Sequence, residues 1–164
     1  MKRAVIYYSL SGNTEKYAID LAHEIGADLI KIRMEKPLPD VRWKQFLIGG
    51  KQAIFHAKPE IEPLPQNIYQ YDEIIIGTPI WAGETASPIN TVLGHREIAD
   101  KVAAVFTLSG SGNNSRCAAR LRRELPNLKT VSSFVDMEQE SAKENGDKLR
   151  ELVKDIQNGE EQKN

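Results

Sequence analysis

Residues 4–14 read AVIYYSLSGNT, and this stretch decides the fold. Its first five residues form an almost unbroken apolar run rich in β-formers, which is typical of a strand buried on both faces. Apolar residues then recur at helical spacing from Asn13 to Ile25, and Gly26 follows as a stop signal. A buried strand, a short loop and a helix in this order predict the first unit of an α/β protein.

The alternation of strand and helix patterns continues along the chain. Predicted strands cover 4–8, 28–32, 73–77, 101–108 and 130–135, and predicted helices cover 13–25, 41–57, 87–93, 115–125 and 138–156. This order predicts a three-layer, doubly wound α/β fold with a five-stranded parallel sheet. We expect one domain over 1–157, followed by a polar C-terminal tail over 158–164. Ligands of such sheets bind beyond the carboxyl ends of the strands, so the loops there are the candidate site.

Composition excludes several classes of function. The chain has 164 residues and a formal net charge of −1, so we expect no nucleic-acid partner, which would need an excess of cations. Its one cysteine, Cys117, forms neither an intrachain disulfide nor a cysteine-based zinc site, and the three histidines lack metal-ligand spacing, so we expect no metal. No stretch has the apolar length of a membrane span or the pattern of a signal peptide, so we expect a cytoplasmic protein with no membrane partner.

The loop after the first predicted strand is rich in hydroxyl groups. Ser9, Ser11 and Thr14 carry them, and a glycine between them permits a tight turn. Backbone amides that open the following helix favour an anion. The loop has no lysine, which separates it from the phosphate loop of nucleoside triphosphatases. We therefore predict a neutral phosphate cradle, although a simple helix cap with two spare serines would give the same pattern.

Two further loops follow predicted strands. Residues 77–84 read GTPIWAGE, where Trp81 offers a flat aromatic face and Gly83 lets the backbone change conformation. The alternative is that Trp81 only anchors this loop. Residues 108–115 read LSGSGNNS, a run of small polar residues and glycines with no aromatic side chain, which permits a ligand to approach closely.

Taken in order, the three loops resemble those of the flavodoxin family. The resemblance rests on Ser-x-Ser-Gly-Asn-Thr over 9–14 and on Gly-x-Pro-x-Trp-x-Gly over 77–83, and it spans nearly the whole chain. It implies the strand order 2-1-3-4-5 and one non-covalent FMN, with the phosphate in the first loop and the ring between the other two. The cofactor-binding residues that it implies are Ser9, Leu10, Ser11, Gly12, Asn13, Thr14, Thr78, Pro79, Ile80, Trp81, Ala82, Gly83, Ser109, Gly110, Ser111 and Gly112.

The function implied by the resemblance is electron transfer through the flavin, between a reductase and an acceptor that are unidentified redox partner proteins. An alternative is an FMN-dependent NAD(P)H oxidoreductase acting on quinones or similar acceptors, because the third loop has no aromatic side chain to cover the ring. A third interpretation is a flavin-free binding protein that retains the fold. We favour the redox carrier, although a net charge of −1 departs from the strong acidity of many carriers in the family.

Other features of the sequence also bear on function. Cys117 and Arg123 match the Cys-x5-Arg pattern of tyrosine phosphatases, but the intervening residues are helix formers without glycine, so we interpret Cys117 as an ordinary helix residue. Arg116, Arg120 and Arg123 recur on one helix face, which indicates a solvated surface or, alternatively, a docking patch for an acidic partner or a nicotinamide cofactor's phosphate. We expect Glu84, beside the second loop, to lower the flavin's reduction potential.

Overall fold

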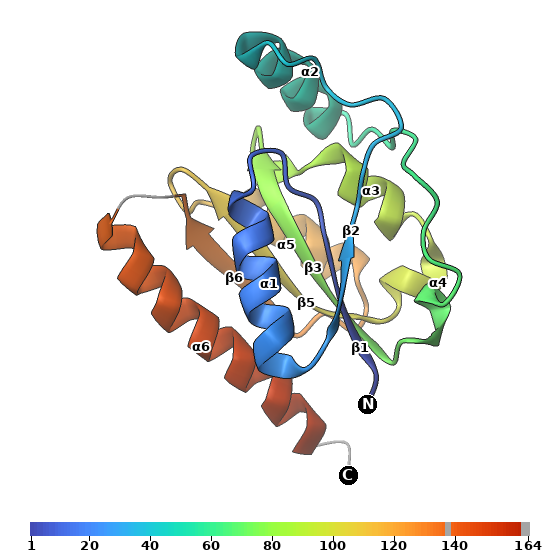
Figure 1. The fold of residues 1–164 in the computed structure, drawn as a ribbon, viewed down its shortest axis with the longest axis vertical. Helices are drawn as coiled ribbons and strands as arrows, with labels where there is room; N and C mark the ends of the chain where they lie inside the picture. The colour runs from blue at the N-terminus through green and yellow to red at the C-terminus, as the bar shows by residue number, and fades with distance from the viewer. Residues whose placement is uncertain (137–138, 162–164) are drawn as a thin grey trace.

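A parallel sheet forms the middle layer of the computed structural model, which describes residues 1–136 and 139–161 (Figure 1). The strands are β1 (Arg3–Tyr7), β2 (Asp28–Lys31), β3 (Glu73–Trp81), β4 (Glu84–Thr85), β5 (Val102–Ser109) and β6 (Thr130–Val135). The helices are α1 (Asn13–Ile25), α2 (Arg42–Ile54), α3 (Ser87–Leu93), α4 (Arg96–Ala99), α5 (Ser115–Glu124) and α6 (Gln139–Glu161), with the 3-10 turn η1 (Ile68–Gln70).

The strand order confirms the predicted topology. The strands pair as β2-β1-β3-β5-β6, and every neighbouring pair on this path is parallel. Counted as five parallel strands, this is the order 2-1-3-4-5 that the resemblance implies. The one addition within the described residues is β4, a short strand that pairs antiparallel with the end of β3.

Two apolar cores lie on the two faces of the sheet because alternate strand residues point to opposite sides. On one face, Val5 of β1 and Phe106 of β5 pack with Leu21 of α1 and Leu152 of α6. On the other face, Ile6 of β1 belongs to a core that includes residues of α3, α4 and α5. Figure 1 shows α1 and α6 side by side on the first of these faces.

The second helix departs from the three-layer expectation. Figure 1 shows α2 beyond the end of the sheet, away from α1 and α6. Its contacts are with β3, β4 and α3, and its buried residues are Gly49 and Ala53. No helix in the described part of the chain is long and apolar enough to cross a membrane.

The structure also moves several predicted boundaries. The prediction of a loop after residue 77 is wrong in part, because β3 continues to Trp81. The chain then turns through Ala82 and Gly83 into β4, which pairs antiparallel with β3. Both turn residues have a positive φ, as a two-residue hairpin of type I′ requires. At the other end, α6 continues to Glu161, beyond the helix end predicted at 156, and residues 162–164 lie outside the described residues.

Candidate functional site

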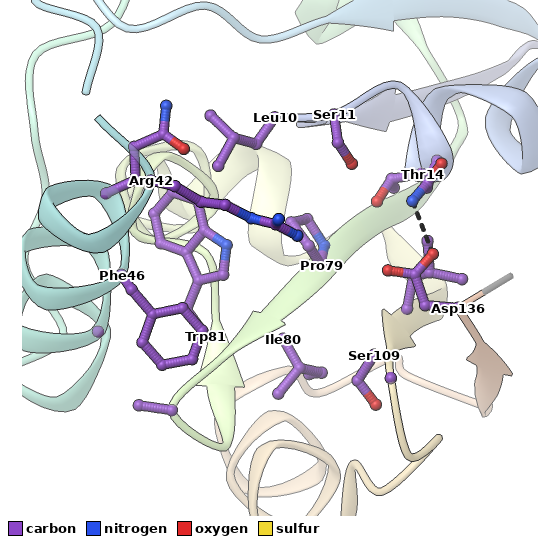
Figure 2. A pocket seen from close by; sticks show the side chains of 16 residues that line it. Leu10, Ser11, Thr14, Arg42, Phe46, Pro79, Ile80, Trp81, Ser109 and Asp136 are labelled. Atoms are coloured by element: carbon purple, nitrogen blue, oxygen red, sulfur yellow. Dashed lines mark hydrogen bonds between the residues drawn. The ribbon is translucent and has the colours of Figure 1, made fainter. Parts of the chain in front are cut away.

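A cavity of about 420 Å³ lies where the carboxyl ends of the strands meet α2 (Figure 2). Four segments at the ends of β1, β3, β5 and β6, together with α2, contribute its walls. The lining residues are Leu10, Ser11, Asn13, Thr14, Arg42, Gln45, Phe46, Gly50, Pro79, Ile80, Trp81, Ala82, Leu108, Ser109, Gly110 and Asp136. The cavity therefore joins the first and second predicted loops, and the start of the third, at one edge of the sheet, as the topology rule for parallel sheets predicts.

The first loop is closed by its own serine. The Gly12 amide donates to Ser9 Oγ at 3.0 Å, and Gly12 adopts a left-handed conformation (φ 93°) where α1 begins. Glycine takes this conformation without the strain that a side chain would bring. Ser9 and Gly12 thus shape the turn rather than line the cavity, while Ser11, Asn13 and Thr14 line it at the N-terminal end of α1. The first amides of a helix have no acceptor within it, so this end is suited to an anion.

A carboxylate stands beside this loop. The Asn13 side-chain amide donates to Asp136 Oδ1 at 2.6 Å, as the dashed line in Figure 2 marks. Asp136 directly follows β6, and its own amide donates to the Ser109 carbonyl at 2.8 Å. Asp136 therefore fixes the Asn13 side chain and also places a negative charge near the candidate anion site.

The start of α1 is also tied to the sheet beneath it. The Tyr7 hydroxyl donates to Glu15 Oε1 at 2.6 Å, and Lys31 Nζ lies 3.0 Å from Glu15 Oε2. The hydrogen bond from Tyr7, followed by that from Lys31, lowers the pKa of Glu15 below its ordinary value, while burial and Glu15 raise the pKa of Tyr7. This cluster fixes the first turn of α1, which contains Asn13 and Thr14, against β1 and β2.

Trp81 forms the opposite end of the cavity from the first loop (Figure 2). Its ring meets the ring of Tyr8 edge-on, with centroids 5.5 Å apart, and a Cβ placed on Gly49 would lie 3.2 Å from Trp81 Cε3. Gly49 and its neighbour Gly50, which both disfavour a helix, thus lie where α2 approaches the indole. This close contact fixes α2 at the mouth of the cavity.

The wall supplied by α2 was not predicted. Arg42, Gln45, Phe46 and Gly50 line the cavity, and Figure 2 shows the Arg42 guanidinium extending across the mouth toward Pro79. Arg42 is the one cationic side chain among the described residues that line the cavity. The sequence-based expectation that an anion would meet only hydroxyls and backbone amides therefore omits a charged group.

Some of the sixteen predicted site residues line the cavity, and others support it. Those that line it are Leu10, Ser11, Asn13, Thr14, Pro79, Ile80, Trp81, Ala82, Ser109 and Gly110, whereas Ser9, Gly12, Thr78, Gly83, Ser111 and Gly112 do not. Thr78 is buried and its Oγ1 accepts from the Ala86 amide at 3.1 Å, which holds the segment after β4. Ser111 Oγ accepts from the Asn113 amide at 3.2 Å, so it braces the third loop.

The arginine face of α5 is only partly solvated, which corrects the expectation. Arg120 is 6% exposed, and its Nε donates to Glu84 Oε2 at 2.8 Å. Glu84 is itself buried and also pairs with Arg116 at 3.0 Å, with His56 Nε2 3.7 Å away. Glu84 does not line the cavity, so its role is to anchor the hairpin to α5 rather than to act on a flavin as a free negative charge.

The Cys-x5-Arg pattern lies within α5 and forms no loop. Cys117 is fully buried, and burial raises the pKa of its thiol to about 12. A thiol that stays protonated is a poor nucleophile. This agrees with Cys117 as an ordinary helix residue.

Several residues of the cavity were missed by sequence reasoning. Asp136 and Leu108 lie at the carboxyl ends of predicted strands, so the rule that selected the other loops could have found them. Arg42, Gln45 and Phe46 carry no such signal, because the sequence predicts a helix there but not which edge of the sheet it approaches.

The fold and the cavity define an α/β protein with a parallel sheet and a cavity at the carboxyl ends of its strands. Comparison with known proteins makes this class specific, because the model of the family named Flavodoxin matches residues 2–155. The chain belongs to the flavodoxin family.

Solved structures agree with this assignment. A flavoprotein from Lactobacillus acidophilus NCFM, solved in complex with FMN, is 30% identical over 79% of this chain and 91% of its own, with a TM-score of 0.64. A chain from Bacteroides eggerthii DSM 20697, provisionally named a flavoprotein, is 27% identical over 80% of this chain and 86% of its own, with a TM-score of 0.66. An archaeal flavodoxin is 17% identical over the full length of both chains, with a TM-score of 0.55, which supports the fold alone.

Proposed function

We propose that this chain binds one FMN non-covalently and transfers electrons through it to partner proteins. The cavity that joins the amide-rich start of α1 to the indole of Trp81 carries the proposal, since a phosphate and a flat ring need these two kinds of surface in one site. Family membership and the FMN complex of the Lactobacillus acidophilus flavoprotein support FMN as the cofactor.

The residues present fit FMN at both ends of the cavity. Ser11, Asn13 and Thr14 provide hydrogen-bonding groups for a phosphate at the helix end. Pro79 and Trp81 provide an apolar floor for the ring, and the third loop leaves room at its polar edge. Bound FMN supplies the redox chemistry, while the protein supplies position, electrostatics and access.

The charged groups of the cavity have opposed effects on an anionic ligand. Arg42 attracts the phosphate or any negative charge on the ring, and Asp136 repels the phosphate. The first loop, residues 9–14, contains no charged side chain. The Asn13 side chain is a neutral amide and donates to Asp136. We therefore expect affinity for FMN to rest on oriented dipoles, with Arg42 as the one compensating cation among the described lining residues.

A second candidate function is that of an FMN-dependent NAD(P)H oxidoreductase. The observation in its favour is the side of the cavity formed by Leu108, Ser109 and Gly110, which offers no aromatic side chain to cover a ring. The burial of Arg120 counts against a nicotinamide phosphate docking on the arginine face of α5.

Reduction of the FMN-loaded protein separates the two functions. A carrier stays oxidised when mixed with NADH or NADPH alone and becomes reduced when a flavoprotein reductase is added. The absorbance of the bound flavin records both steps. Rapid reduction by NADPH alone, followed by turnover with a quinone, would reject the carrier in favour of the oxidoreductase.

A further inference from the structure

The second helix presents its apolar side to solvent. Toward the body, α2 buries only Gly49 and Ala53. On the outside, Trp43, Phe46 and Leu47 are 61%, 85% and 62% exposed. An amphipathic helix of a globular protein normally has the reverse arrangement. We call the outward set the α2 ridge, which consists of Trp43, Phe46, Leu47, Ile54 and Phe55.

Three of the five ridge residues form one stripe along the helix, while Phe46 lies toward the cavity and Phe55 directly follows the end of α2. Trp43, Leu47 and Ile54 are spaced by four and seven residues, which places them on the same side of a helix. Lys44 and Lys51, seven residues apart, run beside this stripe on one flank. The apolar stripe thus has a row of two lysines beside it.

The segment is also free of negative charge. No Asp or Glu occurs from 41 to 59, while the segment contains Arg42, Lys44, Lys51 and Lys58. The whole chain has a formal net charge of −1, so this excess of positive charge is a local feature. A helix with an exposed aromatic side and flanking lysines is typical of a segment that lies on a membrane surface.

We propose that the α2 ridge docks on the surface of an anionic lipid bilayer. The apolar side chains of the α2 ridge enter the boundary between headgroups and acyl chains, and Lys44 and Lys51 bind the lipid phosphates. Figure 1 shows α2 at one end of the molecule, beyond the sheet, where a flat surface can reach it. Because Phe46 belongs both to the ridge and to the cavity wall, docking holds the mouth of the cavity beside the bilayer.

This occupant suits the charges better than a second copy of the chain. A two-fold contact between two α2 helices would bring lysines together with no acid in either helix to pair with them. A bilayer containing anionic lipid offers phosphates along the whole stripe. The expectation of no membrane partner came from the absence of a spanning segment, and that argument does not cover a helix lying on the surface.

Vesicle flotation tests the proposal. The FMN-loaded protein is mixed at low salt with vesicles of equal parts phosphatidylcholine and phosphatidylglycerol, or of phosphatidylcholine alone. We expect it to float with the anionic vesicles and to be released by salt. Reversing both Lys44 and Lys51 to Glu should weaken this binding by about 30-fold or more, since one lysine near an anionic surface contributes about fivefold. Trp43→Ser combined with Leu47→Ser should weaken binding to a similar extent.

Matched variants on α1 serve as the control. Lys16→Glu combined with Ile19→Ser changes an exposed cation and an exposed apolar residue on a different surface, and should leave flotation unchanged. None of the altered residues lines the cavity, so unchanged FMN affinity reports that each variant is folded. Flotation is repeated without FMN, with urea unfolding as the check that each variant is folded, so a failure to float is separate from a failure of the proposed function.

Three results would overturn the proposal. One is a parent protein that fails to float with the anionic vesicles. Another is flotation that the α2 variants leave unchanged. The third is a parent dimer, measured by light scattering, that the Trp43 and Leu47 variant converts to a monomer, because the ridge would then be covered by a second copy.

Discussion

Gly49 of α2 faces the indole ring of Trp81 so closely that a Cβ at Gly49 would lie 3.2 Å from Trp81 Cε3. The neighbouring Gly50 has more room, because a Cβ there would lie 3.8 Å from its nearest neighbour, Ala82 Cβ. The two glycines therefore have different roles. Gly49 sets the distance between α2 and the candidate ring site, whereas Gly50 leaves space at the cavity wall.

Alanine at these two positions should have different effects on stability. Replacing a glycine inside a helix by alanine ordinarily stabilises it by about 0.5–1 kcal/mol. We expect Gly50→Ala to show that gain, and Gly49→Ala to fall about 1 kcal/mol below it because the methyl group displaces Trp81. Urea unfolding gives the free energies. Equal stability of the two variants would contradict the close packing of α2 on Trp81.

Arg42 should support binding of the phosphorylated flavin. Arg42→Gln removes the cation at the cavity mouth, and we expect affinity for FMN to fall about threefold to tenfold at low salt. Lys44→Gln removes the same charge from the same helix, two residues away and outside the cavity, and serves as the control. A fluorescence titration measures both. Equal losses in the two variants would mean that general charge, rather than the position of Arg42, matters.

Asp136 should oppose the phosphate. Asp136→Asn keeps an oxygen that accepts from Asn13 but removes the negative charge beside the loop. We expect affinity for FMN to rise about threefold to tenfold at low salt, with affinity for riboflavin unchanged. A gain that is the same for both ligands would argue that Asp136 does not act on a phosphate.

The ionised Glu15 carboxylate should stabilise the folded protein at neutral pH and lose this effect in acid. Its pKa is lowered in the folded state, first by the hydrogen bond from Tyr7, so its contribution is present above the unfolded pKa and is lost as pH falls through the folded value. Glu15→Gln should therefore be less stable than the parent near pH 7, with the difference shrinking toward about pH 3. Urea unfolding at both values tests this. A difference that does not change with pH would contradict an ionised Glu15 as its source.

Cys117 should be unreactive in the folded protein. Its thiol is buried and its pKa is raised to about 12, so almost no thiolate is present at neutral pH. We expect a disulfide reagent such as DTNB to label it only after unfolding in urea. Fast labelling of the native protein would show that α5 opens far more readily than its packing indicates.

Much of the fold could be predicted from the sequence because buried parallel strands carry a strong local signal. The apolar runs at 4–8 and at 73–77 both became central strands of the sheet. The hairpin after Trp81 was missed because its second strand is two residues long and its turn begins with Ala82, a residue that seldom has a positive φ.

The candidate site was predictable only where it follows strand ends. Ser11 and Trp81 lie in segments whose place follows from the topology. The position of α2 depends on how Gly49 packs against Trp81, which is a tertiary contact. For the same reason, no local pattern indicates that the apolar side of α2 faces outward or that Arg120 is buried against Glu84.

The central claim is that the cavity between the first loop and Trp81 is an FMN site. The most direct test is a titration of the purified protein with FMN and with riboflavin, following flavin fluorescence. We predict quenching that saturates at one FMN per chain, weaker binding of riboflavin, and loss of most of the quenching in Trp81→Leu. A folded protein that quenches neither flavin would contradict the claim and favour a binding protein that retains the fold without the cofactor.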